Sequence, residues 1–458
     1  MSHVVVIGAG ITGLTVGYEL LEAGIETTVF EAGNRVGGKL HTVDWLGRRV
    51  DVGADAFLAR HQAAQELARR VGLGDDLVEP ATGQVWLWIR DRLRPLPEGT
   101  VLGAPTSLIA LARSRVLGSA GLVRAAAEPF LPWRPTAGDR SVADVLGERF
   151  GPDVVDRLVE PLLGGVYAGR ADELSVQSTA PMIAEAMRTK RSLTAALRDH
   201  RHRTVGASLG PVFQTLAGGL QRLPDELAGR LGGRVSLETP VVAVEPTADV
   251  GWRVTTTAGV VDADAVVLCV PAHRAADLLL PASRTVAAEL AGIAYASVAV
   301  VTLAYGPHAR DELPPGSGML VPRSEGRLVK ASTWVSRKWP HQAGGDHMLL
   351  RASVGRIDDA RWRDLDEDDL ITRVDAEIRR ATGMSRPAQE AIVTRWERSL
   401  PQYVVGHAAR VDRIRAELPD GIFVAGAAYD GVGISPCVAS ARAAARGAAI
   451  HARRPAET

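Results

Sequence analysis

The sequence predicts an α/β and α+β protein in which a parallel-sheet nucleotide-binding domain is interrupted by a mixed-sheet domain and a helical lobe. A glycine turn joins a β-branched run to an amphipathic helix near the N-terminus, and a second glycine loop precedes a helix near the C-terminus. Helix-rich and strand-like stretches lie between them. At 458 residues, the chain is long enough for two or three domains.

The first predicted element is a strand, helix and strand unit over residues 4–31, VVVIGAGITGLTVGYELLEAGIETTVFE. Gly8 permits a tight turn, Gly10 lets the backbone approach a pyrophosphate, and Gly13 lets the helix pack closely. The helix N-terminus would face the phosphates, and Glu31 would accept the ribose hydroxyls. The unit therefore predicts a Rossmann-like dinucleotide site.

The residues after Glu31 favour FAD over a nicotinamide dinucleotide. They read EAGNRVGGKLHT and supply Arg35, the pair Gly37–Gly38 and Lys39 beside the first pyrophosphate site. This extension is typical of FAD domains of the glutathione-reductase type. In the following DVGADAF segment, Gly53 and Ala54 are small enough to let an isoalloxazine ring pass close to the backbone.

The second glycine loop lies in IFVAGAAYDGVGISPCVASARAAARGAA, residues 422–449. Gly431 and Gly433 precede a helix that carries Pro436 in its first turn. The N-terminus of this helix would stabilise negative charge on the N1–C2=O edge of a reduced flavin. Asp430 is placed to bind a ribityl or phosphate group.

The remaining elements follow in chain order. We expect a helix over 61–73, a hairpin over 84–97, mostly helix over 105–200, a helix over 215–231 with Gly218–Gly219 in its first turn, strands at 234–237, 241–244, 252–256, 265–270 and 295–305, alternating strands over 318–355, a helix over 366–382, a strand at 421–425 and a helix over 436–451. The predicted domains are a discontinuous FAD-binding domain (1–80, 205–275 and 415–458), a helical lobe covering the substrate or membrane side (81–204) and a substrate-binding sheet domain (276–414).

Bulk properties exclude several classes of protein. The net charge is zero, which gives no support for nucleic-acid binding. Two cysteines cannot build a disulfide framework or a CxxC metal site, and the histidines form no metal constellation, so no metal is expected. No signal peptide or transmembrane segment is predicted, and a cytoplasmic location follows. A peripheral membrane contact through residues 108–133 is left open, although an amphipathic helix pair covering a pocket is the preferred interpretation.

The chain resembles the bacterial coproporphyrinogen and protoporphyrinogen oxidases, within the amine-oxidase-like flavoprotein superfamily. Four stretches carry this resemblance over nearly the whole length: EPLLGGVYAG (160–169), FQTLAGGLQRLPDEL (213–227), SRKWPH (336–341) and WERSLPQYVVGH (396–407). Many oxidases share the flavin motifs, whereas the GVYAG and KWPH stretches are much narrower. In two places the chain departs from several relatives, which have a tyrosine where Ser353 stands and an arginine where Gly164 stands.

The resemblance and the glycine motifs together give the residues expected to contact FAD. Val241 would meet the adenine through its backbone, and Trp396 would lie near the flavin ring. The full set is Gly8, Ala9, Gly10, Ile11, Thr12, Gly13, Glu31, Ala32, Arg35, Gly38, Lys39, Gly53, Ala54, Asp55, Ala56, Val241, Trp396, Asp430, Val432, Gly433 and Ile434. The cysteine that some relatives bond to flavin has no clear counterpart, so non-covalent FAD is expected.

The resemblance implies an oxygen-using, six-electron oxidation of coproporphyrinogen III to coproporphyrin III in haem biosynthesis, acting on CH–CH groups and producing hydrogen peroxide. The alternatives are protoporphyrinogen IX as substrate, or a flavin amine oxidase or carotenoid-type desaturase. Amine-oxidase relatives carry a lysine on the strand matching residues 295–305, which contains none. A ferrochelatase is the expected downstream partner.

Catalysis would depend on orientation of the substrate more than on a side-chain base. A backbone carbonyl at Gly164 or Gly165, or water, would take the proton. Arg60, Arg337 and Lys338 are candidates for the substrate carboxylates, although a solvated surface charge is the preferred interpretation of each.

Overall fold

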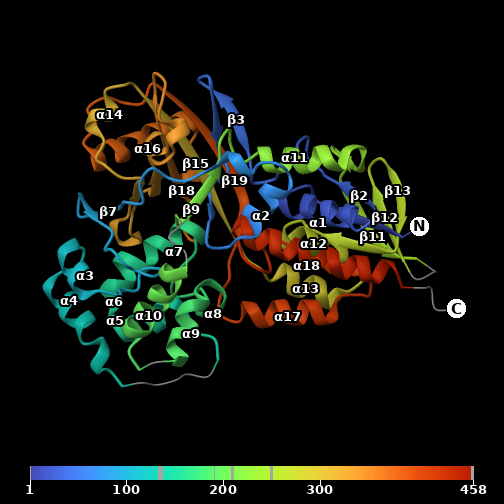
Figure 1. Ribbon diagram of the computed structural model, residues 1–458, viewed down its shortest axis with the longest axis horizontal. Coiled ribbons are helices and arrows are strands. Elements are labelled where there is room, and N and C mark those ends of the chain that lie inside the picture. Colours follow the sequence, from blue (N-terminus) through green and yellow to red (C-terminus); the bar gives the residue numbers. More distant parts are fainter. Residues whose placement is uncertain (1, 133–137, 190, 208–210, 248–250, 455–458) are drawn as a thin grey trace. The chain divides into compact units, whose positions relative to one another are not determined.

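The structure is a computed structural model that describes residues 2–132, 138–189, 191–207, 211–247 and 251–454. The chain divides into two units, each built from separated stretches of sequence (Figure 1). Unit 1 contains Met1–Val78, Phe213–Ala294 and Ala408–Thr458, and unit 2 contains Glu79–Val212 and Tyr295–His407. The predicted division into cofactor, lobe and substrate domains stays a prediction about the roles of these segments.

A five-stranded parallel sheet forms the centre of unit 1, with the order β10-β2-β1-β14-β20. Its strands are β1 (His3–Ile7), β2 (Glu26–Phe30), β10 (Val235–Ser236), β14 (Ala265–Leu268) and β20 (Ile422–Val424). Val4, Val5 and Val6 have no exposed surface. Strands covered on both faces are apolar throughout, which explains the β-branched run in β1. The three sequence stretches of unit 1 therefore meet in one sheet.

Helices α1 (Ile11–Glu22), α11 (Arg222–Leu231) and α18 (Ile434–Ala452) pack together beside this sheet (Figure 1). Small residues allow close approach, since a Cβ on Gly17 of α1 would lie 3.0 Å from Val29 Cγ2. Arg442 of α18 donates to Glu19 of α1, which joins the two ends of the sequence. The other elements of unit 1 are α2 (Ala63–Arg70), α12 (Ala272–Leu279), α13 (Arg284–Ala291), α17 (His407–Glu417), β3 (Thr42–Trp45), β4 (Arg48–Asp51), β5 (Phe57–Leu58), β6 (Leu77–Val78), β9 (Phe213–Leu216), β11 (Val241–Pro246), β12 (Trp252–Thr256) and β13 (Gly259–Ala263).

A seven-stranded sheet forms the frame of unit 2, with the order β19-β15-β18-β17-β16-β7-β8. All of its pairs are antiparallel except β16 with β7. Its strands are β7 (Val85–Ile89), β8 (Arg92–Pro95), β15 (Tyr295–Tyr305), β16 (Gly318–Leu320), β17 (Val329–Thr333), β18 (Met348–Val354) and β19 (Glu390–Pro401). Helix α16 (Glu367–Thr382) packs against this sheet through Leu370, Val374 and Ile378, all fully buried.

The helical part of unit 2 consists mostly of short helices. They are α3 (Leu108–Ser114), α4 (Ser119–Ala126), α5 (Val142–Phe150), α6 (Pro152–Val154), α7 (Glu160–Tyr167), α8 (Val176–Thr179), α9 (Pro181–Thr189), α10 (Leu193–Ala207), α14 (Ala309–Glu312) and α15 (Val335–Lys338). A π-helical segment, Val155–Val159, leads into α7. Trp133, at the end of the candidate membrane segment, lies outside the described residues. Across the described ranges, no helix has both the length and the apolar character that a bilayer crossing requires.

The structure confirms the predicted hairpin over 84–97, the strand over 295–305 and the helix over 366–382. The predicted helix over 215–231 is wrong in its first part. Strand β9 ends at Leu216, and Gly218 and Gly219 follow with φ angles of +81° and +92°. A right-handed helix cannot include such residues, so the helix begins only at Arg222.

Candidate active site

The first glycine turn has the geometry that its sequence predicts. Gly8 has a φ of +101°, and its N–H donates to the carbonyl of Phe30 at 2.7 Å. A Cβ on Gly13 would lie 1.8 Å from the carbonyl oxygen of Gly8, so only glycine lets α1 start this close to the turn. A Cβ on Gly10 would meet nothing within 4 Å. Open space therefore lies beside the first turn of α1.

This open helix N-terminus fits a pyrophosphate. Gly10 provides no capping side chain, and the first turn of α1 contains no acidic residue. The first N–H groups of a helix lack intrahelical partners and carry partial positive charge, and these groups bind phosphates in many nucleotide sites. Ala9, Ile11 and Thr12 complete the turn as the sequence predicts.

Glu31 is fixed next to the turn by backbone donors. Its carboxylate accepts from the N–H of Ala9 and from the N–H of Gly33, each at 2.8 Å. The N–H of Thr239 donates to the main-chain oxygen of Glu31 at 2.8 Å, two residues before Val241. The predicted ribose carboxylate, its neighbour Ala32 and the predicted adenine contact therefore lie on adjoining segments.

The loop after Glu31 lies against the glycine turn. Gly37 donates to the carbonyl of Ala9 at 2.8 Å, and a Cβ on Gly38 would lie 3.4 Å from the Cα of Gly10. The guanidinium of Arg35 donates to the carbonyl of Gly38 at 2.6 Å and to that of Leu40 at 3.3 Å. Arg35 therefore holds the loop in shape, and its contact with a pyrophosphate stays a prediction.

The two glycine motifs converge within unit 1. A Cβ on Gly426 would lie 3.2 Å from Thr12 Oγ1, and Thr12 shares a hydrogen bond with Cys437 of α18. Burial lowers the pKa of Lys39, while the nearby Cys437 acts in the opposite direction. Residues from the N-terminal and C-terminal parts of the sequence therefore lie close together at the first turn of α1.

The loop before α18 has a second open helix N-terminus. Gly433 is the extended N-cap of α18, without a capping side chain and without an acid in the first turn. This fits the predicted role of the segment Val432–Ile434 near a reduced flavin. The carboxylate of Asp430 accepts from Arg415 at 2.7 Å and from Ser440, so its contact with a ribityl or phosphate group stays a prediction.

The small-residue segment Gly53, Ala54, Asp55 and Ala56 follows β4 and is half-buried. The N–H of Ala54 donates to the carbonyl of Lys39 at 3.0 Å, which joins this segment to the loop after Glu31. With this segment included, every predicted cofactor residue except Trp396 lies in unit 1.

The GVYAG stretch and Trp396 meet within unit 2. Ala168, which ends α7 in the left-handed conformation at φ +51°, forms a small apolar cluster with Val298, against which Trp396 packs. The carbonyl of Gly164 already accepts from the N–H of Ala168 at 3.0 Å. Gly165 is exposed, and a Cβ on it would lie 3.5 Å from Leu320 Cδ2. The two glycines proposed as proton acceptors therefore differ in availability, with the exposed Gly165 the less constrained of the two.

An ion network anchors α7 to the sheet of unit 2. Glu160, at the start of α7, accepts from Arg323 at 2.9 Å and from the N–H of Ala171 at 2.8 Å. Arg323 also pairs with Asp358, to which Arg170 donates at 3.1 Å. The network fixes both ends of the GVYAG stretch.

The predicted substrate cations have different surroundings. Arg60 is exposed and lies in unit 1, whereas Arg337 and Lys338 lie in unit 2. Arg337 donates to the main-chain oxygens of Arg310 and of Leu313, the latter at 2.9 Å. The Nζ of Lys338 lies 4.6 Å from the ring centroid of Trp339. Their contacts with substrate stay predictions.

Sequence reasoning missed a buried lysine on the sheet of unit 2. Lys330 of β17 is 2% exposed, and burial, with a smaller contribution from Arg356, lowers its pKa to about 7. The one signal in the sequence is a lysine inside the apolar strand pattern LVKAST, in a chain with four lysines.

Comparisons with known proteins agree with this geometry. The profile of the family described as "Flavin containing amine oxidoreductase" matches residues 11–449. The chain is 34% identical to the coproporphyrinogen III oxidase of Bacillus subtilis (strain 168), over 96% of this chain and 97% of the relative. It is 38% identical to the coproporphyrinogen III oxidase of Mycobacterium tuberculosis (strain H37Rv), over 95% of each.

A solved structure is similar over the same length. A crystal structure from Exiguobacterium sp. 255-15, assigned provisionally as a protoporphyrinogen oxidase, matches with a TM-score of 0.89 and 32% identity over 98% of this chain and 99% of that one. The similarity therefore covers both units.

Proposed function

We propose a substrate for this chain, which belongs to the flavin-containing amine oxidoreductase family. The chain is an FAD-dependent oxidase. We infer that it oxidises coproporphyrinogen III to coproporphyrin III, with oxygen as the electron acceptor and hydrogen peroxide as product. The observation that carries this proposal is similarity over nearly the whole chain to two proteins named coproporphyrinogen III oxidase.

The residues of unit 1 support the cofactor part of the proposal. The open first turn of α1 holds the pyrophosphate, the carboxylate of Glu31 binds the ribose, and the N-terminus of α18 favours negative charge on the flavin ring. When bound, FAD accepts the electrons that leave the substrate. The protein contributes binding, orientation and electrostatics.

The residues of unit 2 support the substrate part. In the proposal, the GVYAG stretch and Trp396 orient a methylene bridge, and a main-chain oxygen near Gly165 or a water takes the pyrrole proton. Arg60, Arg337 and Lys338 bind propionate groups, since cationic side chains suit carboxylates. The ferrochelatase partner and the cytoplasmic location, with its open alternative of peripheral membrane contact, belong to this proposal as well.

Protoporphyrinogen IX is the second candidate substrate, favoured by the provisional assignment of the Exiguobacterium structure. Coproporphyrinogen III carries four propionates and protoporphyrinogen IX two. A cationic rim that binds carboxylates would therefore discriminate between the two porphyrinogens mainly through KM and less through kcat.

The test supplies the flavin-loaded protein with each porphyrinogen side by side and measures porphyrin fluorescence together with oxygen uptake. We expect a higher kcat/KM for coproporphyrinogen III and one peroxide for each oxygen consumed. A preference for protoporphyrinogen IX would select the second candidate. No fluorescence above autoxidation with either substrate, from protein that carries its flavin, would refute both.

A further inference from the structure

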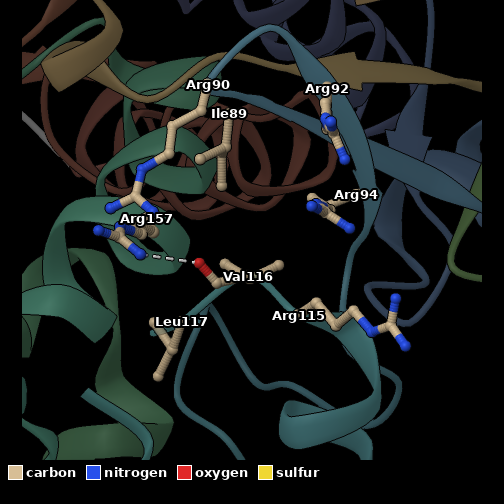
Figure 2. A pocket seen from close by; sticks show the side chains of 8 residues that line it. All are labelled: Ile89, Arg90, Arg92, Arg94, Arg115, Val116, Leu117 and Arg157. Carbon is tan, nitrogen blue, oxygen red and sulfur yellow. Dashed lines mark hydrogen bonds between the residues drawn. The ribbon is translucent and has the colours of Figure 1, made fainter. Parts of the chain in front are cut away.

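Five arginines line one small cavity in unit 2, apart from the residues of the proposed reaction. They are Arg90, Arg92, Arg94, Arg115 and Arg157, with Ile89, Val116 and Leu117 completing the wall. In Figure 2 the arginines of the β7–β8 hairpin and Arg157 surround the space beside Val116 and Leu117, and Arg115 stands at its edge. The cations come from three separate segments: the hairpin, the loop after α3 and the π-helical segment.

These guanidinium groups have no carboxylate partners in the described part of the chain. No ion pair joins any of the five to an acid, and Arg157 uses one donor on the carbonyl of Val116 at 2.9 Å. Asp91, which lies between Arg90 and Arg92 in sequence, forms ion pairs with Arg327 at 2.6 Å and with Arg380 at 2.7 Å. The carboxylate of Glu325 accepts from the main-chain N–H of Arg90 at 3.0 Å, so one acid lies beside the five guanidinium groups and most of their positive charge is uncompensated.

The backbone around the cavity is specialised as well. Arg90 and Arg115 have φ angles of +51° and +54°, in the left-handed region that favours glycine. Arg157 lies in a π-helical segment, a feature found frequently at functional sites. The side chains are therefore presented from constrained positions and not from a regular solvated helix face.

The size and charge of the cavity define the ligand. A volume of about 160 Å³ is too small for a tetrapyrrole or a dinucleotide, since pockets for drug-sized molecules measure about 300–1,000 Å³. A single carboxylate would leave most of the positive charge unpaired. A phosphate-bearing anion supplies several charges and several acceptor oxygens in a small volume, and arginine binds phosphate through paired donors.

We propose that this cavity, the arginine cavity, binds a compact anion carrying one or two phosphate groups. The inference goes beyond the proposed oxidation and does not depend on it. The same chemistry has two sources, a free phosphate compound or the headgroup of an anionic phospholipid. The second source is considered because Ile109, Val123 and Phe130 of the neighbouring segment are exposed apolar residues.

The test titrates inorganic pyrophosphate into flavin-loaded protein by calorimetry at constant ionic strength. Bound flavin occupies the pyrophosphate site at α1, so heat from that site does not interfere. We expect one saturable site, weakened about tenfold or more in the double variant Arg92→Ser/Arg115→Ser, because two charge-assisted contacts are lost. The matched control Arg113→Ser/Arg188→Ser removes the same charge from exposed positions outside the cavity and keeps the wild-type affinity.

A second arm identifies the source of the phosphate. Co-sedimentation with phosphatidylglycerol vesicles that is lost in the Arg92→Ser/Arg115→Ser variant would support the proposal with a lipid headgroup as ligand, whereas pyrophosphate binding without vesicle binding would support it with a soluble anion. Absence of both, or equal binding by the double variant, overturns the proposal. So does a raised KM for the porphyrinogen in that variant, since the cavity would then serve substrate propionates.

Discussion

Single glycines determine how closely the backbone approaches the cofactor. At Gly13 a Cβ would fall 1.8 Å from the carbonyl oxygen of Gly8, whereas at Gly10 a Cβ would meet no atom within 4 Å. The first position serves packing of helix on strand, and the second leaves room for a ligand. Two residues of the same type in one motif thus have different physical roles.

Gly13→Ala is expected to remove FAD binding, because the added Cβ forces α1 away from the glycine turn and moves the first N–H groups of α1 out of position for the pyrophosphate. The purified variant should lack the absorbance band of oxidised flavin. Gly229→Ala is the matched control, since Gly229 lies in α11 with nothing within 4 Å of a built Cβ. It should keep its flavin and gain up to about 1 kcal/mol of stability. Flavin retained at wild-type occupancy by Gly13→Ala would contradict the assigned role.

Lys330→Met is expected to stabilise the protein at neutral pH by about 1–4 kcal/mol, because it removes a buried amine whose charged form is disfavoured by burial and by the neighbouring Arg356. The pKa of Lys330 is lowered from 10.5 to about 7, so between these values the unfolded chain binds more protons than the folded one. Wild-type stability should therefore rise with pH from about 7 to 10 through this group.

The measurement for Lys330 is urea unfolding at pH 7 and at pH 9. The wild type should gain more stability between the two values than Lys330→Met does. Equal pH dependence in both proteins would show that Lys330 is not held neutral by burial.

At the scale of elements, buried polar networks hold the short helices of unit 2 in place. Glu128 is fully buried, pairs with Arg149 of α5 and accepts from the N–H of Leu193 at 2.7 Å, at the start of α10. Burial raises the pKa of Glu128, but the bonds from Arg149, Ser192 and Leu193 outweigh it, and the pKa lies below its ordinary value. The carboxylate therefore stabilises several helix ends at once.

Glu128→Ala is expected to cost about 3–5 kcal/mol in the free energy of unfolding, since it leaves Arg149 buried without its partner. Glu185→Ala, at an exposed pair with Arg188 on α9, should change stability by less than about 0.5 kcal/mol. The depressed pKa of Glu128 adds stability that is present above pH 4.5 and is lost as the pH falls below it. Urea unfolding of both variants, with a wild-type pH series, tests these expectations.

Elements with a strong local pattern could be predicted from the sequence, and those decided by tertiary contacts could not. The apolar run that precedes a charged turn over 84–97 predicts β7 and β8, and three consecutive residues of β7, Leu87, Trp88 and Ile89, are buried. The predicted helix over 215–231 fails at its start because β9 pairs there with β6 through Thr215 and Leu216, and this tertiary pairing overrides local preference.

For the candidate site, the sequence predicted the backbone turns but not the partners of the side chains. Glycine spacing reports backbone geometry directly, so the cofactor turn could be read from the sequence. The pairing of Asp430 with Arg415 and the burial of Lys330 depend on tertiary contacts. The donation from Arg35 to the carbonyl of Gly38 is local, but it depends on the conformation of the loop that both residues share. The arginine cavity draws on three separate segments and therefore has no local signal.

At the scale of the whole molecule, the cofactor-binding unit is assembled from three stretches of chain. FAD that contacts both the N-terminal turn and the loop before α18 would bind the folded state of unit 1 and not the unfolded chain. Its binding should therefore raise the free energy of unfolding of flavin-stripped protein by about 2.7 kcal/mol at a FAD concentration one hundred times Kd. Thermal unfolding at increasing FAD concentration measures this, with ADP as a partial ligand for comparison. A melting temperature unaffected by FAD would contradict the assembled site.

The nesting of the two units also sets an order for their biosynthesis. Unit 2 ends at His407, whereas the sheet of unit 1 needs β20, which ends at Val424, and its helix layer needs α18. At about 5–20 residues per second, a ribosome takes roughly 20 to 90 s to make 458 residues. The strands that pair with β1 and β2 are translated by residue 268, but β14 then lacks its own partner β20 until after unit 2 has been made. The inserted unit can finish folding first, and the nascent chain can capture its flavin only after β20 and α18 have been translated.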